Sequence, residues 1–135
     1  MAREILFKAK RKDNGEWVEG LLWKKKYKSN KWFISCFPDK DDNEEVYVID
    51  INTLCQYTGL TDKNGNKIWE NDVVRNEYER NGFQTLKIYY STENAKYVLM
   101  NAYKMFTDFD SLLGQLEVIG NIFDNPELLG GADNG

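Results

Sequence analysis

The sequence contains no histidine, which is the commonest general base and the commonest protein ligand for metals. Serine or cysteine nucleophiles that depend on a histidine are therefore excluded. The two cysteines, Cys36 and Cys55, are too few for a structural zinc site, which needs four nitrogen or sulfur ligands. Only the carboxylates remain as candidate catalytic groups, and on their own they are weak evidence for a catalytic site. We therefore expect no catalytic site, no metal and no cofactor.

Long hydrophobic runs and nucleotide-binding loops are also missing. No stretch approaches the roughly 18 consecutive apolar residues of a membrane-spanning helix, and only Ile5 to Phe7 separate the charged start from Lys8. Neither Gly-x-x-x-x-Gly-Lys-Ser/Thr nor Gly-x-Gly-x-x-Gly occurs. We expect a cytoplasmic protein that has no membrane partner and keeps its two cysteines as buried thiols.

Charge is unevenly distributed along the chain. Residues 1–35 carry ten Lys/Arg against four Asp/Glu, and residues 36–135 carry eight against eighteen, which leaves a net charge of −4. Such asymmetry favours electrostatic attraction between the two parts of one chain, head-to-tail self-association of two chains, or a basic face that binds a polyanion. The partners we predict are a second copy of the chain, in a homo-oligomer, and an unidentified protein, with nucleic acid as the alternative.

Short β-capable runs alternate with turn signals along the chain. We expect strands at 4–10, 16–23, 32–37 and 45–49, with Asn14-Gly15 as a hairpin turn and residues 50–54 as a linker. Further strands are expected after residue 70, at 72–75, 84–90, 97–100 and 116–123. The predicted core includes Val73, Ile88, Val98, Val118 and Ile119.

Helical signals are few. A polar start followed by paired leucines predicts one short helix at 108–113, and Pro126 suits the first position of a helical turn at 125–129. The length of 135 residues and the 41% hydrophobic content predict one domain. The pattern as a whole indicates an all-β meander or a small barrel.

Residues 62–73 carry the most strongly specified turns. Asp62 suits the first position of a type I turn, where its carboxylate accepts backbone N–H groups, and Gly65 suits the left-handed position that follows. A calcium loop is not supported, because Lys67 and Val73 stand where glycine and glutamate are required. Asp72 is expected to anchor the next turn rather than to form an acid-base pair with Glu70.

Three blocks of sequence resemble the YopX family. They are residues 3–9, residues 56–74 with Gln-Tyr-Thr-Gly-Leu-Thr-Asp-Lys-Asn-Gly at their start, and residues 117–129. Asn71 stands where the family usually has glycine, and asparagine also tolerates positive φ. The motif positions to which we assign a structural role are Gln56, Tyr57, Thr58, Gly59, Asp62, Asn64, Gly65, Asp72, Gly120 and Asn121.

The resemblance implies a phage or prophage origin and no known activity. It implies a mostly β fold, with a small SH3-like barrel core, an added N-terminal β-meander and at most one or two short helices. Residues 1–129 would form a single YopX-like domain, with the meander over 1–54 and the barrel core over 55–129. Residues 130–135 are expected to be a flexible tail.

A lysine-rich segment between two tryptophans is the best candidate for a binding site. Lysines neutralise phosphates and exposed aromatic rings stack on bases, so the segment suits a nucleic acid or a protein partner. Its members are Trp23, Lys24, Lys25, Lys26, Lys28, Lys31 and Trp32. The alternative is a solvated loop, with the two tryptophans as cross-strand core partners.

A second basic segment holds Lys8, Lys10, Arg11 and Lys12, and a basic patch forms only if the two segments share a face. Our first hypothesis is a non-catalytic accessory protein that binds another macromolecule or itself. The alternative is a nucleic-acid-binding protein that uses the basic N-terminal face. An enzyme is the least supported class.

Overall fold

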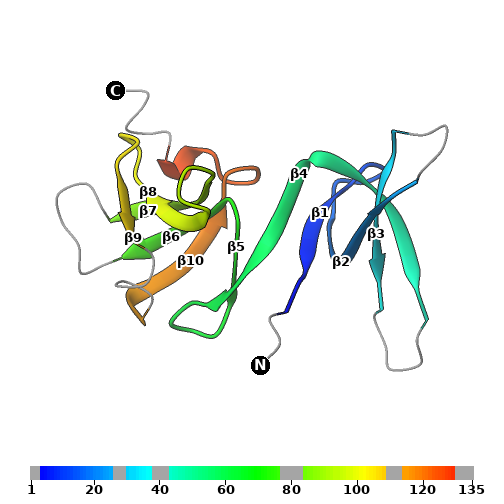
Figure 1. Ribbon diagram of the computed structural model, residues 1–135, viewed down its shortest axis with the longest axis horizontal. Helices are drawn as coiled ribbons and strands as arrows, with labels where there is room; N and C mark the ends of the chain where they lie inside the picture. Colours follow the sequence, from blue (N-terminus) through cyan, green and yellow to red (C-terminus); the bar gives the residue numbers. More distant parts are fainter. Residues whose placement is uncertain (1–3, 26–29, 38–42, 77–83, 109–113, 130–135) are drawn as a thin grey trace. The chain divides into compact units, whose positions relative to one another are not determined.

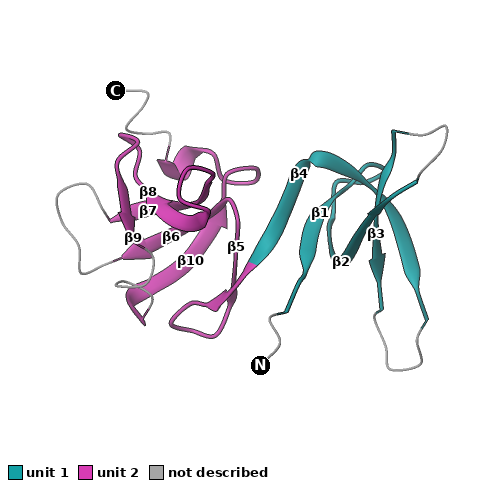
Figure 2. Ribbon diagram, viewed as in Figure 1, with its two compact units in different colours: residues 1–57 teal, residues 58–135 magenta. Residues whose placement is uncertain are grey.

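The computed structural model describes residues 4–25, 30–37, 43–76, 84–108 and 114–129, and the structural statements below concern these ranges (Figure 1). They contain ten strands in two antiparallel sheets, and within them only residues 127–129 are α-helical. The predicted mostly β fold is confirmed. Two compact units divide the chain, an N-terminal unit of residues 1–57 and a C-terminal unit of residues 58–135 (Figure 2).

Four strands of the N-terminal unit close into a ring. Strand β1 pairs with both β2 and β4, and β3 lies between β2 and β4, so the ladder returns to its start (Figure 1). The segment predicted as an added meander therefore closes on itself, around a small core of Ala9, Ile34 and Ile49. The strands are β1 (Phe7–Arg11), β2 (Trp17–Lys24), β3 (Trp32–Cys36) and β4 (Glu45–Thr61).

The ring closes because its two long strands change partner along their length. Up to Gly20, β2 pairs with β1, and from Leu21 it pairs with β3. Strand β4 likewise pairs with β3 up to Ile49 and with β1 from Ile49 onward. At Gly20 the chains approach so closely that a Cβ atom would lie 2.0 Å from the carbonyl oxygen of Ser35.

Residues 50–54, which the sequence predicts as a linker, are part of β4. The register between β1 and β4 shifts between Lys8 and Lys10, and the Thr53 hydroxyl fills the irregularity by accepting the Lys10 N–H at 2.8 Å. The same hydroxyl donates to the Asp50 carbonyl at 2.7 Å. A bulge breaks the two-residue alternation that marks a strand, so the sequence signal was lost here.

The C-terminal unit holds a sheet with the order β10-β6-β7-β8-β9, and β5 pairs with the end of β4. Its fully buried core is Ile68, Val74, Leu86, Ile88, Leu99 and Leu116. The strands are β5 (Lys67–Trp69), β6 (Asp72–Asn76), β7 (Thr85–Ser91), β8 (Lys96–Met100), β9 (Phe106–Asp108) and β10 (Leu116–Asn121).

Three of the five predicted core residues are buried, namely Val73, Ile88 and Val98. Val118 and Ile119 are only half-buried, because β10 lies at the edge of its sheet. The predicted Asn14-Gly15 turn is present, with Gly15 at φ +76°. Pro126 precedes the helical turn at 127–129, as expected.

Some sequence predictions fail or fall outside the described ranges. Asp108 ends strand β9 instead of starting a helix. The rest of the predicted helix, at 109–113, lies outside the described residues. The predicted turn at 81–82 and the predicted tail at 130–135 lie outside them as well. Cys36 and Cys55 form no disulfide, and only Cys55 is fully buried. In the described part of the chain, no helix is long and apolar enough to cross a membrane.

Replacing Gly20 with alanine should strongly destabilise the N-terminal unit, because the added methyl group would meet the backbone carbonyl of Ser35. We expect a loss of about 3 kcal/mol or more in the free energy of unfolding, at the upper end for overpacked cores. Urea denaturation followed by tryptophan fluorescence measures it. The control is Gly114→Ala, where a Cβ atom meets nothing within 4 Å, and equal losses in both variants would contradict the close approach.

Candidate macromolecule-binding surface

Five side chains form an apolar surface on the outside of the ring. Trp23 lies opposite Phe33, and Phe33 lies opposite Val48. In the neighbouring row, Leu21 and Val46 flank Ser35 from both sides. Side chains alternate across a strand, so these residues point away from the core residues Ile34 and Ile49. We call this surface the outer apolar face: Leu21, Trp23, Phe33, Val46 and Val48.

Trp23 is held in one orientation on this face. Its ring stacks on Phe33 with 4.4 Å between ring centroids and 13° between planes. Its indole Nε1–H donates to Ser35 Oγ at 2.8 Å, and that serine is itself buried. Trp23 nevertheless keeps 40% of its surface exposed. A rigid, exposed indole loses little conformational entropy when a ligand covers it.

An open hollow adjoins the outer apolar face. Its lining shares Val46 and Val48 with that face and adds Tyr47 from the same strand. The other lining residues are Arg11, Lys12, Asp13 and Lys31. Lys12 reaches this place because its backbone N–H donates to the Val48 carbonyl at 3.0 Å. Lys31 of the first basic segment and Arg11 and Lys12 of the second therefore line the same hollow.

Two of the charged residues that line the hollow form an ion pair with each other. Arg11 is held by Asp13 through hydrogen bonds of 2.9 and 2.6 Å, and its guanidinium lies 4.3 Å from the centre of the Tyr47 ring. The hydrogen bond from Arg11 lowers the pKa of Asp13, so this carboxylate stays charged and offsets the guanidinium. Lys12 and Lys31 are exposed and supply the net positive charge of the hollow.

The remaining predicted residues divide between core and surface. Trp32 packs against the ring core, and the Nζ atom of Lys24 lies 5.3 Å from the centre of its ring. The register pairs Trp23 with Phe33, so the two tryptophans are not cross-strand partners. Lys25 is exposed, and Lys26 and Lys28 lie outside the described residues.

Lys8 and Lys10 lie over Trp17, with their Nζ atoms 4.7 and 5.5 Å from the ring centre, and do not line the hollow.

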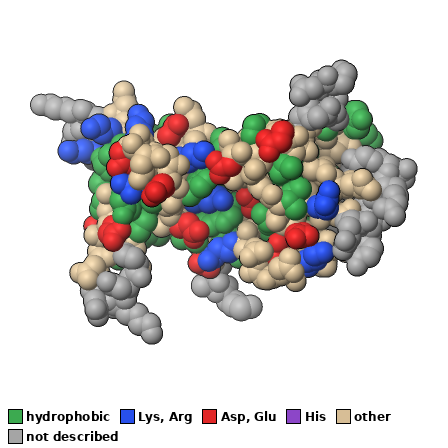
Figure 3. All heavy atoms as spheres, turned by 180° about the vertical axis from the view of Figure 1, so that it is seen from behind, with side chains coloured by type: hydrophobic (Ala, Val, Ile, Leu, Met, Phe, Trp, Pro, Cys, Tyr) green, Lys and Arg blue, Asp and Glu red, His purple; other side chains and the backbone are tan. Residues whose placement is uncertain are grey.

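Four residues of this surface were not predicted from the sequence, namely Phe33, Val46, Tyr47 and Val48. The alternation within residues 32–36 and 45–49 was the available signal, but it does not say which face is covered. On the face drawn in Figure 3, acidic, basic and apolar side chains are interspersed.

The YopX-like motif residues of the C-terminal unit have structural roles. Asp62 is buried, and its carboxylate accepts the backbone N–H groups of Asn64, Asn66 and Val118, each at 2.9 Å. One side chain thus holds its own turn and the edge of β10. The Gly65 N–H donates to the Asp62 carbonyl at 3.0 Å, and Gly65 has φ +84°, as predicted.

The second turn of the motif is built in a similar way. The buried Asp72 carboxylate accepts the Trp69 N–H at 2.8 Å, which confirms the predicted anchoring role. Asn71 adopts φ +71°, so asparagine occupies a left-handed position here, as expected. Its N–H donates to Ile88 and its carbonyl accepts from Ile122.

The other motif positions also serve the backbone. Thr58 Oγ1 donates to the Ile68 carbonyl at 2.7 Å, and Gly59 has φ +88°. Asn121 Oδ1 accepts the N–H groups of Phe123 and Asp124. A Cβ atom at Gly120 would lie 2.5 Å from Asn125 Oδ1. In the N-terminal unit, Gln56 pairs with Phe7 and the Tyr57 N–H donates to the Leu6 carbonyl.

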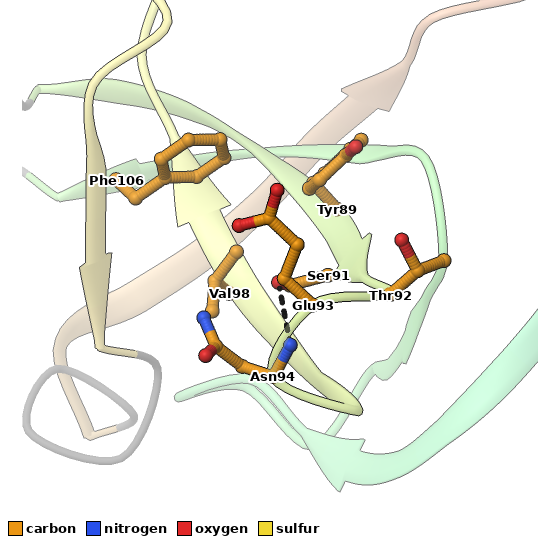
Figure 4. Close-up of a pocket in the computed structure, with 7 residues that line it drawn as sticks. All are labelled: Tyr89, Ser91, Thr92, Glu93, Asn94, Val98 and Phe106. Atoms are coloured by element: carbon orange, nitrogen blue, oxygen red, sulfur yellow. Dashed lines mark hydrogen bonds between the residues drawn. The ribbon is translucent and has the colours of Figure 1, made fainter.

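A second hollow lies on the C-terminal unit (Figure 4). The Tyr89 and Phe106 rings, 5.7 Å apart, flank it, and the Glu93 carboxylate points between them (Figure 4). Val98, Ser91, Thr92 and Asn94 complete the lining. No sequence signal marked these residues.

The described ranges hold no group of three or more cysteines or carboxylates able to bind a metal ion.

The comparisons with known proteins agree with this architecture. A family model described as YopX protein matches residues 6–130. A solved structure described as protein EF1440 from Enterococcus faecalis is similar, with a TM-score of 0.57 and 22% sequence identity. The match covers 95% of this chain and 99% of that chain, and at this identity it shows the fold alone. No curated protein matches the sequence.

Replacing Asp62 with asparagine should destabilise the C-terminal unit by about 1–3 kcal/mol, because an amide has one acceptor oxygen and cannot serve Val118 and the turn together. Chemical denaturation at pH 7 measures this loss. Asn64→Ala is the control, since it leaves the backbone N–H that Asp62 accepts.

The same carboxylate should make stability depend on acid. Burial opposes the charged form, but the hydrogen bonds from Val118, Asn66 and Asn64 outweigh it and lower the pKa of Asp62. The contribution is then complete above the pKa of an unfolded aspartate, about 3.9, and is lost as the pH falls through the lower folded pKa. Between pH 5 and pH 2 the wild type should lose more stability than Asp62→Asn, and parallel losses would contradict this.

Proposed function

The chain belongs to the YopX family, and we propose that it is a non-catalytic accessory protein of phage or prophage origin that binds another macromolecule or itself. The observation that carries the proposal is the outer apolar face, where Trp23 is immobilised and yet exposed. We place the protein in the cytoplasm of the bacterial host on the strength of its sequence.

Exposed apolar side chains gathered on one face of a small protein mark an interaction surface more often than isolated ones do. Leu21 and Val46 are 54% and 43% exposed, and they lie in the row next to Trp23. Tryptophan is enriched among the residues that dominate binding energies. The outer apolar face lies on β2, β3 and β4, and β3 is paired with the other two strands on its two sides.

Self-association through this face predicts an oligomer at micromolar concentration. The double substitution Leu21→Glu and Val46→Glu should return the protein to a 15.8 kDa species in sedimentation velocity, since two carboxylates would have to be desolvated at the interface. Met105→Glu, at an exposed apolar residue of the C-terminal unit, should leave the oligomer intact. A wild type that sediments only as the 15.8 kDa species excludes self-association and leaves a different macromolecule as the partner.

Nucleic acid is the second candidate partner, and one observation favours it. Lys12 and Lys31 line a hollow together with the aromatic Tyr47, and the hollow shares Val46 and Val48 with the outer apolar face. The net charge of −4 opposes binding of a polyanion. Salt at physiological concentration screens exposed charges beyond about 8 Å, so the local lysines outweigh distant carboxylates.

Binding of a nucleic acid through the hollow predicts a strong effect of lysine reversal. Lys12→Glu with Lys31→Glu should weaken binding to labelled oligonucleotides at least tenfold at low salt, because each lysine neutralises a phosphate. The control pair is Lys67→Glu with Lys104→Glu, two exposed lysines of the C-terminal unit with the same change in net charge. Fluorescence anisotropy measures both, and equal weakening would show that only net charge matters.

A further inference from the structure

We infer that the hollow on the C-terminal unit binds a lysine or arginine side chain of a partner protein other than this chain (Figure 4). The aliphatic stem of that side chain would lie against the rings of Tyr89 and Phe106, and its cationic head would pair with Glu93. This inference goes beyond the proposed function, which places its ligand on the outer apolar face of the N-terminal unit. It is carried by the apolar walls of the hollow, its carboxylate and the charge of the C-terminal unit.

The walls of the hollow are apolar and come from three neighbouring strands. Tyr89 of β7 lies opposite Val98 of β8, and Phe106 of β9 lies opposite Met100, two residues further along β8. The two rings lie 5.7 Å apart, and Val98 is only 5% exposed between them and the turn. Tyr89 and Phe106 remain 37% and 55% exposed. A methylene chain that covers them removes apolar surface from water, whichever part of each ring it meets.

The Glu93 carboxylate is placed by the turn between β7 and β8. Ser91 and Lys96 pair at the base of this turn, and Ser91 Oγ accepts the Asn94 N–H at 3.3 Å. Ala95 lies in the left-handed region at φ +53°. The carboxylate points between the two rings (Figure 4), and among the ion pairs of the described ranges none involves Glu93.

Two lysines lie on the same face of the sheet, and neither lines the hollow. The Nζ atom of Lys96 lies 3.3 Å from Asp108 Oδ1. Lys87 is half-buried; burial lowers the pKa of its ammonium group, and the charge of Glu70 opposes that shift. Among the described residues that line the hollow, Glu93 alone is charged. The hollow is therefore complementary to a single positive charge.

This combination of groups selects a lysine or arginine side chain. Both have a stem of methylene groups that covers apolar surface while the charged head stays in a polar environment. A metal ion or a small ammonium ion lacks the stem, and an aliphatic side chain lacks the head. Residues 58–135 carry twelve Asp/Glu against seven Lys/Arg, so the field of this unit attracts a basic partner. We assign the occupant to a different protein because self-association is proposed for the N-terminal unit.

The test is an NMR titration of the full chain with three kinds of probe. The first kind is the whole side chain, as the acetylated methylamides of arginine and lysine. The second keeps the stem without the charge, as the same derivatives of citrulline and norleucine. The third keeps the head alone, as guanidinium and methylammonium ions. The wild type should bind the first kind about threefold or more tightly than the other two, with shifts of the Glu93, Asn94 and Val98 amides.

Two substitutions separate the charge from the wall. Glu93→Gln keeps the shape of the side chain and should weaken binding of the arginine and lysine probes about three- to fivefold, with the norleucine probe unchanged. Phe106→Ala removes apolar surface and should weaken binding of all three probes alike, about threefold. The controls are Glu127→Gln and Tyr103→Ala, at an exposed carboxylate and an exposed ring outside the hollow, and both should leave binding unchanged.

The opposite outcomes overturn the inference. Equal binding of guanidinium and the arginine probe would show a simple cation site in which the rings have no part. Shifts confined to other residues would place the site elsewhere. If Glu93→Gln with Phe106→Ala returns an oligomeric wild type to a 15.8 kDa species in sedimentation velocity, the occupant is a second copy of the chain. The proposed function is tested separately, by Leu21→Glu with Val46→Glu, and does not depend on these results.

Discussion

The close approach of β2 and β3 at Gly20 is the constraint on which the N-terminal unit depends. Because no side chain stands there, β2 can leave β1 and continue its pairing with β3 within one residue. That change of partner closes the ring and aligns Trp23, Phe33 and Val48 in one cross-strand row. The end of β1 then brings Lys12 to the same row. The candidate binding face, with an aromatic and a basic end, follows from the geometry of closure.

The C-terminal unit depends in a similar way on one carboxylate. Asp62 accepts backbone N–H groups from its own turn and from Val118, which lies 56 positions later. The motif that carries the resemblance to the YopX family is thus a set of turn and edge contacts. It accounts for two turns and an edge of the C-terminal unit, and the candidate binding surface lies among other residues.

Electrostatics and packing play different parts on the outer apolar face. Of the cations that line the adjoining hollow, Arg11 is compensated by Asp13. Its apolar part is preorganised, since Trp23 is fixed by a stack and a hydrogen bond before any ligand arrives. Preorganised aromatic surface binds without the entropic cost of ordering a flexible side chain. The face is therefore suited to a ligand that brings apolar groups of its own.

The sequence by itself determined the properties that local chemistry controls. It predicted most of the strands, the Asp62 and Asp72 anchors and the left-handed positions at Gly65 and Asn71, because a turn is specified by a few adjacent residues. Only the tertiary structure decided that residues 50–54 continue a strand, that Ile119 lies at an edge and that Trp23 faces outward while Trp32 packs inward. The physical reason is register. Pairing partners far apart in the chain set which face of a strand is covered, and local sequence does not specify them.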